Sequence, residues 1–413
     1  MFGAAGVQKV LSDADAFGTA ISVGERFSLP SSLNPLNSGL FSMRGEEHKA
    51  QQQLLRTTID AACIHSAGGF VAEGWQRLAE GLTVPDAVPL LSEMRRLALY
   101  ISTRLVFGDE DLALGKLAQS YFELRRTLSA TRTPPELAER RTLIQLGARL
   151  DRLLRARLQD LRTEVTTGSA LARSCIAARL CSTATEQSVT LTEDQLVAQT
   201  NALFMSSSEP IAVSLTWILL LLSQQPRLRH ALRLEQADAS AHGSAEVRNQ
   251  ETNRPLLRAV IQETLRLLPP NAIMVRLTTR PVKLLGHSLP ANCEILLSPF
   301  VAHRDQHEFP RPDVFDADRW RGQKPSAYTY FPFGVGARYC VGRQLAQFLL
   351  VSALTAILTR YEVVLAGDQT LDWTMNVTMM PAQEPIVRFV PVQPQQTAVG
   401  GLLRGPVADL VRF

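Results

Sequence analysis

Between residues 333 and 342 the chain reads Phe333-Gly334-Val335-Gly336-Ala337-Arg338-Tyr339-Cys340-Val341-Gly342. This stretch places one cysteine at the end of a glycine-bearing loop, immediately before a predicted long helix. The helix amides and the cationic Arg338 favour negative charge on the sulfur, so Cys340 can be held as a thiolate. The glycines remove side-chain bulk, which lets the backbone approach a flat cofactor. The stretch therefore predicts a thiolate cradle for an iron macrocycle.

The pattern Phe-x-x-Gly-x-Arg-x-Cys-x-Gly resembles the haem-binding loop of the cytochrome P450 family. The alternative is that Cys340 is a small buried hydrophobe, which is the usual fate of a free cysteine. The other residues of the pattern, all present at the family's spacing, favour the haem interpretation. The resemblance implies that the cofactor is haem b, that Cys340 ligates its iron, and that Phe333, Gly334 and Arg338 belong to the cofactor site.

Three basic residues are candidates to hold the two haem propionates, which need donors in a mostly dry site. Arg338 is the first, and Arg276 is the second because the family often places a propionate ligand on the strand that follows Pro269-Pro270. His48 is the third, since it matches the histidine of the family's His-x-x-x-Arg. The arginine of that motif is Gln52 here, so this contact is weakened or supplied from elsewhere. Taken alone, His48 would more often be a solvated helix side chain.

Glu263 and Arg266 lie three residues apart, on one face of a predicted helix that begins at Arg254-Pro255. Taken alone, they could form an ordinary surface ion pair. The motif resembles the Glu-x-x-Arg helix of cytochromes P450, in which a later arginine bridges the pair. Arg319 supplies that residue here. The resemblance implies a buried structural clamp without a redox role.

The predicted helix over Leu191–Gln225 carries the main departure from the family. The family runs Ala/Gly-Gly-x-Asp/Glu-Thr-Thr across the haem face, and the corresponding stretch here is Ser206-Ser207-Ser208-Glu209-Pro210-Ile211. The acid is present as Glu209, but a proline replaces the alcohol. Pro210 lacks an N–H group and clashes with the carbonyl four residues earlier, so we expect a kink that frees that carbonyl. The alternative is that Pro210 marks a helix boundary.

The missing threonine matters because it helps to order proton delivery during oxygen activation in the family. We hypothesise that Glu209 and Ser208 take part in catalysis in its place. Ser207, ordered water or a hydroxyl group of the substrate are the other candidates.

The fold class predicted from residue periodicity is mainly α with small β-sheets (α+β). The resemblance implies the cytochrome P450 fold, with a large helical lobe, a smaller β-rich lobe and a shortened N-terminal β region. Residues 1–391 are expected to form one haem domain, and residues 392–413 a loosely attached C-terminal tail. The predicted segments are helices over Phe41–Ala62, Ala87–Val106, Leu112–Leu128, Pro135–Thr166 and Gly342–Tyr361, a surface loop over Gln236–Asn253, and strands within Met274–Phe300 and Glu362–Val390.

Composition excludes several classes of protein. Basic residues exceed acidic ones by 43 − 39 = 4 without a long basic run, so nucleic acid is not an expected partner. The five cysteines form no C-x-x-C pair, which fits a reducing cytosol. The longest apolar stretches, Ile211–Leu222 and Phe348–Leu358, fall short of the roughly 18 residues that span a bilayer. We therefore expect a cytoplasmic monomer without a membrane anchor.

These observations predict a haem-thiolate monooxygenase that inserts one oxygen atom from O2 into an apolar small molecule of terpenoid, polyketide or fatty-acyl type. Electrons would come from a separate ferredoxin or flavoprotein reductase, because the sequence has no flavin motif and no Gly-x-Gly-x-x-Gly nucleotide motif. The resemblance places the substrate wall at Ala202, Phe204, Met205, Asn271–Val275 and Val377–Met380.

Two alternatives remain open at this point. Pro210 motivates an enzyme that uses peroxide or rearranges its substrate. Gln52 and the short N-terminal region motivate a binding protein that has kept the fold and lost catalysis.

Overall fold

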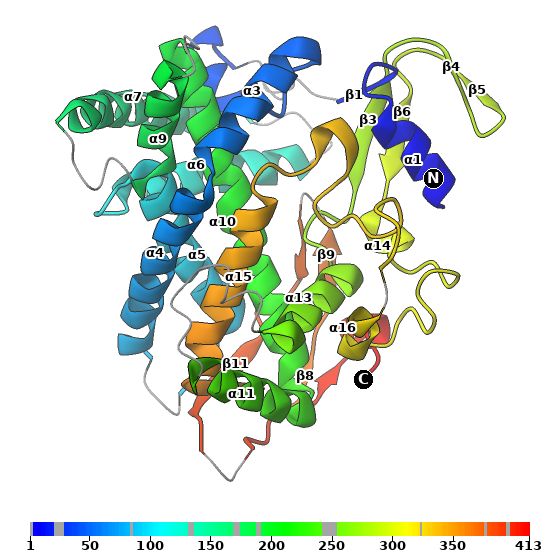
Figure 1. The fold of residues 1–413 in the computed structure, drawn as a ribbon. Helices are drawn as coiled ribbons and strands as arrows, with labels where there is room; N and C mark the ends of the chain where they lie inside the picture. Colours follow the sequence, from blue (N-terminus) through cyan, green and yellow to red (C-terminus); the bar gives the residue numbers. More distant parts are fainter. Residues whose placement is uncertain are drawn as a thin grey trace. The chain divides into compact units, whose positions relative to one another are not determined.

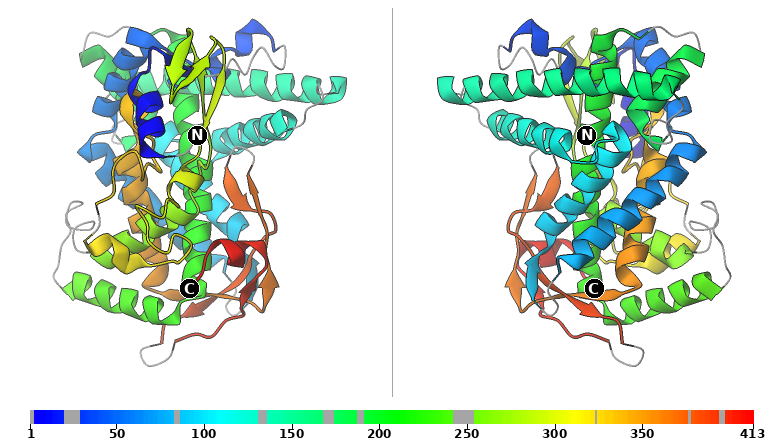
Figure 2. Two further views of the ribbon diagram at one scale, coloured as in Figure 1. Left: turned by 90° about the vertical axis from the view of Figure 1, so that its right-hand side faces the viewer. Right: turned by 90° about the vertical axis from the view of Figure 1, so that its left-hand side faces the viewer.

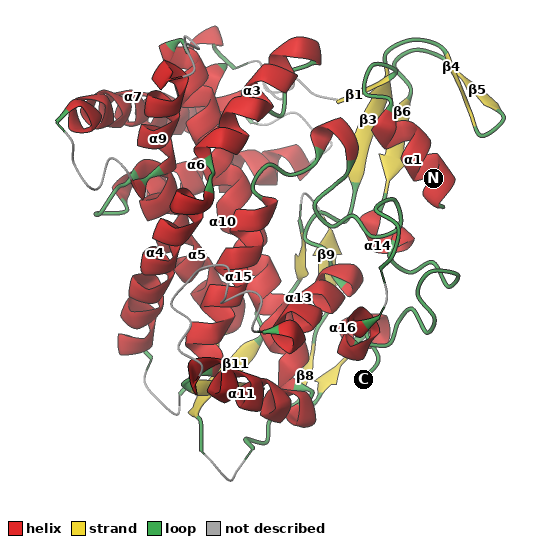
Figure 3. Cartoon of the chain, in the orientation of Figure 1, coloured by secondary structure: helices red, strands yellow, loops and turns green. Residues whose placement is uncertain are grey.

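Helices make up most of the chain, and the strands are short and lie mainly in its last third (Figures 1 and 3). The computed structural model describes residues 3–19, 29–82, 86–130, 136–167, 174–186, 191–241, 254–322, 324–375, 378–393 and 397–413. The chain divides into two compact units. The first unit comprises Met1–Asp13, Val71–Leu97 and Glu209–Phe413, and the second comprises Ala14–Phe70 and Ala98–Ser208.

The second unit is built from helices and contains one short strand in its described part. Helices α6 and α7 pack along each other, as do α7 and α9, and Figure 2 shows α7 beside α6. Helix α7 buries leucines at positions 143, 150, 154, 158 and 161, which form one apolar stripe at helical spacing. Its elements, some of which continue into the first unit, are β1 (Phe17–Thr19), η1 (Ser31–Leu33), η2 (Pro35–Asn37), α3 (Gly45–Thr58), α4 (Ala61–Glu80), α5 (Leu90–Phe107), α6 (Ala113–Ala130), α7 (Leu137–Thr166), α9 (Ile176–Glu186) and α10 (Glu193–Ser223).

The first unit combines helices with small sheets. Strand β11 (Ile386–Pro391) pairs antiparallel with both β2 (Ala87–Pro89) and β7 (Tyr361–Leu365), and β3 (Met274–Thr278) pairs antiparallel with β6 (Glu294–Leu297). Its further strands are β4 (Val282–Leu284), β5 (His287–Leu289), β8 (Gln369–Thr370), β9 (Trp373–Met375), β10 (Met379–Pro381) and β12 (Leu403–Arg404). Its helices are α1 (Ala4–Ser12), α11 (Pro226–Ala241), α13 (Pro255–Leu267), α14 (Pro299–Ala302), η3 (Ala317–Arg321), η4 (Gly336–Arg338), α15 (Arg343–Leu358) and α16 (Pro406–Leu410).

Helix α10 runs without interruption through Pro210, so the prediction of a helix interior is confirmed and that of a boundary is wrong. Pro210 has no N–H group to give the Ser206 carbonyl, while its own carbonyl accepts from the Ser214 hydroxyl at 2.7 Å. Among the described helices, α10 alone is long and apolar enough to cross a membrane. Buried residues make up 67% of its most apolar window, as in the core helix of a globular protein.

The expectation of a loosely attached tail is wrong for residues 397–413. Strand β12 pairs in parallel with β8, and Val407 and Val411 are buried. The Arg412 carbonyl accepts from the Phe315 N–H at 2.8 Å, and the Arg412 N–H donates to the Asp313 carbonyl at 2.8 Å. Its buried valines and its backbone hydrogen bonds hold this segment against the rest of the first unit. The domain boundary at residue 391 stays a prediction.

Candidate cofactor and active site

The loop over residues 333–342 closes through its own backbone. The Cys340 N–H donates to the Phe333 carbonyl at 2.8 Å, and the Gly334 N–H donates to the Phe331 carbonyl at 2.9 Å. Gly334 and Gly336 have φ angles of 69° and 76°, in the left-handed region that favours glycine. The glycines predicted from the sequence thus form the turn that presents Cys340.

Gly336 also lies in close contact with the N-terminal helix. A Cβ at this position would lie 2.1 Å from the Leu11 carbonyl oxygen, closer than non-bonded atoms approach. Helix α1 therefore packs directly on the cysteine loop, and a glycine is required both by the backbone conformation and by this contact.

Cys340 keeps solvent-accessible surface although protein surrounds most of it. Desolvation raises the pKa of its thiol, while a bond from the Gly342 backbone and the charge of Arg343 act in the opposite direction. The helix amides and Arg338 were expected to favour a thiolate, whereas here desolvation has the largest effect and Arg343 supplies the nearby charge. An exposed cysteine residue with a desolvated thiol fits a metal ligand, because a coordinated metal keeps the thiol deprotonated.

Open space lies beside Gly342, two residues after the cysteine. A Cβ on Gly342 would meet no atom within 4 Å, and helix α15 begins at the next residue without a side-chain cap on its first amides. Phe333 lies under the Arg343 guanidinium, 5.9 Å from ring centroid to Cζ.

Arg276 lies on β3 in the same unit, half-buried. Its guanidinium donates to the adjacent Val275 carbonyl at 2.9 Å, and desolvation lowers its pKa. No carboxylate in the described part of the chain pairs with it. A desolvated guanidinium without a carboxylate partner is suited to bind a haem propionate. Arg276 and Cys340 of the first unit are therefore compatible with a bound haem.

The two other predicted propionate ligands lie on different units. Arg338 ends the short η4 helix of the cysteine loop and is partly exposed. His48 lies on α3 in the second unit and is 4% exposed, so the alternative of a solvated side chain is wrong. Gln52, one turn further along α3, is buried as well.

Glu263 and Arg266 form the predicted clamp, and neither side chain has exposed surface. Arg266 donates to both Glu263 oxygens, at 2.8 and 2.9 Å, and Arg319 reaches Oε1 of Glu263 at 3.4 Å. The indole N–H of Trp320 donates to Oε2 of Glu263 at 2.9 Å, a contact that was not predicted from the sequence.

The remaining Arg266 donors end on backbone oxygens, among them the carbonyls of His303 at 3.0 Å and Pro312 at 2.7 Å. The predicted buried clamp is confirmed. It satisfies every charge with protein atoms, as a dry ion pair requires.

His303 joins the clamp to the segment before the cysteine loop. Its Nε2 accepts from the Phe331 N–H at 2.9 Å, and its Nδ1 lies 3.2 Å from the Arg266 carbonyl. Burial lowers the pKa of this fully buried ring to about 3, and the charges of Arg266 and Arg304 add to the effect. His303 is therefore a neutral structural bridge, and His307 is exposed.

Glu209 makes a bidentate ion pair that sequence reasoning missed. Arg95 of α5 donates to Oε1 at 2.5 Å and to Oε2 at 3.1 Å, and its Nη2 also lies 3.4 Å from the Met380 sulfur. No local pattern links positions 95 and 209, because they are 114 residues apart. The neighbouring Ser208 is half-buried, whereas Ser206 and Ser207 turn their hydroxyls back to the carbonyls of Leu203 and Phe204.

The predicted substrate wall divides into core and accessible residues. Phe204 is 1% exposed and stacks on Phe107, with 4.8 Å between the ring centroids, so it belongs to the core of the second unit. Met205 is half-buried. Ile273 is exposed on the first unit, Met379 is buried, and Val377 lies outside the described residues.

Residues 36–389 match the sequence model of the cytochrome P450 family. The chain belongs to the cytochrome P450 family.

Curated relatives of this cytochrome P450 include bacterial and mitochondrial enzymes. Cyclooctatin synthase from Streptomyces melanosporofaciens is 27% identical over 86% of this chain and 78% of its own length. Putative cytochrome P450 135B1 from Mycobacterium bovis is 28% identical over 79% of this chain and 69% of its own length. Mouse mitochondrial cytochrome P450 11B2 is 31% identical, but the match spans only 55% of this chain and 45% of the relative.

A solved structure with the same fold is described as retinoic acid bound cyanobacterial CYP120A1. It superposes with a TM-score of 0.83 at 20% identity and covers 95% of this chain and 88% of the other. The predicted cytochrome P450 fold is confirmed. The predicted cofactor and enzyme class are confirmed for the family, whose members carry haem b on a cysteine thiolate and act as monooxygenases.

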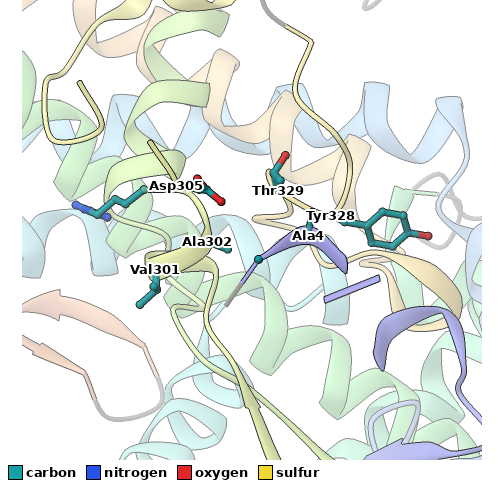
Figure 4. Close-up of a pocket in the computed structure, with 8 residues that line it drawn as sticks. Ala4, Val301, Ala302, Asp305, Tyr328 and Thr329 are labelled. Atoms are coloured by element: carbon teal, nitrogen blue, oxygen red, sulfur yellow. The ribbon is translucent and has the colours of Figure 1, made fainter. Parts of the chain in front are cut away.

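A pocket of about 190 Å³ in the first unit contains none of the predicted site residues (Figure 4). It is lined by the N-terminal end of α1, by α14 and the residues after it, and by Tyr328 and Thr329. Its lining mixes small apolar side chains with Arg304 and Asp305, and it is distinct from the cysteine loop.

Proposed function

We propose that this cytochrome P450 is a cytoplasmic monooxygenase in which Cys340 ligates the haem iron. The observation that carries the proposal is the exposed residue Cys340, which lies in a loop turned by two left-handed glycines just before the N-terminus of α15. A haem with a cysteine ligand supplies the redox chemistry that cleaves O2 and oxidises unactivated C–H bonds.

Each remaining residue of the site has a proposed role in holding the cofactor. Arg276 pairs with a propionate, because that bond would compensate its desolvated charge. Arg338 and His48 are the further candidates for propionate contacts. Phe333 and Gly334 form the cysteine loop itself, through the Phe333 carbonyl and the left-handed turn at Gly334.

Proton delivery is proposed to involve Glu209 and Ser208 on α10. Arg95 fixes the orientation of the Glu209 carboxylate through both oxygens, and a carboxylate has further acceptor sites for a water or a hydroxyl group. The Ser206 carbonyl, which lacks an amide partner at Pro210, is an additional acceptor on the same helix.

The proposed substrate is a mainly apolar small molecule, and the proposed electron donor is a separate ferredoxin or flavoprotein reductase. The donor would dock near Arg338 of the cysteine loop and Arg343 at the start of α15, whose guanidinium groups can attract acidic side chains. The protein is proposed to act as a monomer.

The carbon monoxide difference spectrum of the reduced protein tests the role of Cys340. We expect Cys340→Ser to lose the Soret band typical of thiolate ligation, because an alcohol does not replace a thiolate on iron. Cys293→Ser is the matched control, since Cys293 is also partly accessible and lies outside the loop. A Cys340→Ser protein with an unchanged spectrum would contradict the proposal.

A second candidate function is favoured by Pro210 within α10. The family's threonine helps to deliver protons to reduced O2, and it is absent here. An enzyme that uses hydrogen peroxide, which already carries two protons, or that rearranges an oxygenated substrate does not need this delivery. Product formation with hydrogen peroxide and no reductase would favour this candidate. Product formation only with NAD(P)H and a reductase would favour the monooxygenase.

A further inference from the structure

Helix α7 exposes a row of arginines to which the proposed function assigns no role. Arg141, Arg149 and Arg152 are exposed, and none of them forms an ion pair or a side-chain hydrogen bond with the described part of the chain. Positions 141 and 152 are three helical turns apart, and position 149 lies one turn before 152, so the three side chains share one side of the helix over about 16 Å. We call these three residues the α7 basic stripe.

The stripe lies opposite the face of α7 that packs on the protein. That face buries Leu143, Leu150 and Leu154, which lie about half a turn around the helix from the stripe. Figure 2 shows α7 as one straight helix, so the stripe is a straight row of side chains. A partner can therefore contact the stripe along its whole length.

No carboxylate on the same side of α7 offsets the charge of the stripe. Every exposed residue from position 141 to position 156 is basic or uncharged. The acidic residue in that range, Asp151, is half-buried and pairs with Arg155 at 2.8 Å. The three charges repel one another, and an anionic surface laid along the helix would relieve this repulsion.

Two exposed leucines flank the stripe. Leu137 is 64% exposed and lies one turn before Arg141, and Leu153 is 39% exposed and lies one turn after Arg149. Arginine side chains also have an apolar stem, which can lie along an apolar surface while the charged head stays with water or anions. Basic and apolar side chains on one exposed helix are typical of proteins that bind at the level of lipid head groups. An acidic protein partner would not require the exposed leucines, so a lipid surface is favoured.

We propose that the α7 basic stripe binds the surface of an anionic phospholipid membrane, peripherally and reversibly. The cytoplasmic leaflet carries a negative surface potential, and each basic side chain near it strengthens binding about fivefold, which corresponds to about 1 kcal/mol. The three arginines together would contribute about 100-fold. Leu137 and Leu153 would add apolar contacts with the boundary of the acyl chains. The inference goes beyond the proposed function, because it concerns where the protein resides and involves none of the cofactor-site residues.

Co-sedimentation of the haem-loaded protein with lipid vesicles tests the proposal. One set of vesicles consists of phosphatidylcholine alone, and the other of equal parts of phosphatidylcholine and the anionic phosphatidylglycerol. At low ionic strength we expect binding to the anionic vesicles to be about 100-fold tighter than to the neutral ones. Added salt should reduce this difference, because it screens the charges. Equal binding to both vesicles, or binding to neither, would overturn the proposal.

Two triple variants of equal net charge assign the binding to the stripe. The stripe variant, with Gln in place of each of its three arginines, should bind anionic vesicles about 100-fold more weakly than the wild type. The control variant changes three exposed arginines of other elements and should lose less than about threefold. Its substitutions are Arg227→Gln, Arg258→Gln and Arg280→Gln. Equal losses in the two variants would show that net charge alone drives the binding, and would overturn the proposal.

A charge-preserving variant separates a lipid surface from an acidic protein partner. Lys at all three stripe positions should keep vesicle binding within about threefold, because the surface potential of the membrane acts on charge. A protein that binds the stripe through paired bonds between guanidinium and carboxylate groups would bind the Lys variant poorly. A Lys variant that loses vesicle binding would overturn the proposal. A Gln variant that binds vesicles as the wild type does, but has a raised KM for a plant-type ferredoxin, would also overturn it.

This proposal and the proposed function can fail separately. Co-sedimentation needs no reductase, no O2 and no turnover, so membrane binding can be present even if the enzyme proves to use peroxide. Conversely, a thiolate spectrum that depends on Cys340 can coexist with a protein that ignores anionic vesicles.

Discussion

Arg266 and Arg276 lie ten residues apart in one unit of the protein, yet their surroundings differ in kind. Arg266 has no exposed surface and directs its donors to one carboxylate and to backbone carbonyls. Arg276 is half-buried, donates to the neighbouring Val275 carbonyl and pairs with no carboxylate of the described chain. The protein compensates the first charge itself, whereas the second is left for a bound anion to compensate.

The difference separates residues that hold the fold from residues that hold ligands. A buried ion pair adds little net stability, but removing one partner leaves an uncompensated charge in a dry interior. A desolvated cation without a protein anion weakens the fold slightly and strengthens the binding of a negative group. The predictions below test this division, beginning with the largest expected effect.

Glu263→Ala should reduce the free energy of unfolding by about 3–5 kcal/mol, since it leaves Arg266 and Arg319 buried without their carboxylate. Urea unfolding followed by circular dichroism measures the change. Glu294→Ala, at an exposed position, is the control and should change stability by less than about 0.5 kcal/mol. A loss below about 1 kcal/mol for Glu263→Ala would contradict the distinction between charges that the protein pairs itself and charges that are left for a ligand.

His303 should make the fold sensitive to mild acid. Its folded pKa is about 3, whereas in the unfolded chain it is near 6.5, so the unfolded state takes up a proton below pH 6.5 that the folded state does not accept. This contribution to stability is complete above pH 6.5 and falls with decreasing pH. Between pH 6.5 and 5 the loss should be about 2 kcal/mol.

Urea unfolding of His303→Gln at both pH values isolates this contribution. The variant keeps a side-chain acceptor for Phe331 but cannot titrate, so its stability should fall by about 2 kcal/mol less than that of the wild type over this range. His287→Gln, at an exposed position, should behave as the wild type does. Equal pH dependence of wild type and His303→Gln would show that the ring is accessible to protons.

Arg276→Met should have the smallest effect on the polypeptide itself. We expect the free energy of unfolding of the haem-free chain to change by less than about 1 kcal/mol, because no protein anion loses its partner. Haem transfer to excess apomyoglobin should nevertheless become at least about tenfold faster, as expected when a charged hydrogen bond to a propionate is lost.

Arg280→Met, at an exposed position after β3, is the matched control for haem loss. A large loss of stability for Arg276→Met, without a change in haem transfer, would place Arg276 in the same class as Arg266.

Local sequence patterns predicted the elements that carry a long apolar stripe or a clear terminal signal. Helix α7 was found from its leucines, and α13 from Pro255 at its first turn and the two prolines after it. Most of α4 and all of α9 were not predicted, and α11 continues to Ala241 where a loop was expected from Gln236 on. Residues 242–253 of that expected loop lie outside the described residues. Residues 87–89, expected to open α5, form β2 because they pair with β11.

Local geometry was predicted best where short motifs specify the residues that form it. The cysteine loop and the clamp fall into this class, since spacing and residue type specify them. Contacts between residues far apart in the sequence, such as Arg95 with Glu209 and Arg125 with Asn37, leave no periodic signal. Their partners are set by how helices pack, which residue patterns within a single helix do not record.

The carbonyl of Leu11 against Gly336 links the beginning of the chain to the cofactor loop. A side chain at position 336 would collide with this carbonyl, so α1 packs directly on the loop and we expect the two segments to order together. Protection of the α1 amides from hydrogen exchange would then rise when the cofactor loads. A protease that cuts within residues 4–12 should therefore distinguish loaded from unloaded protein long before the helical core unfolds.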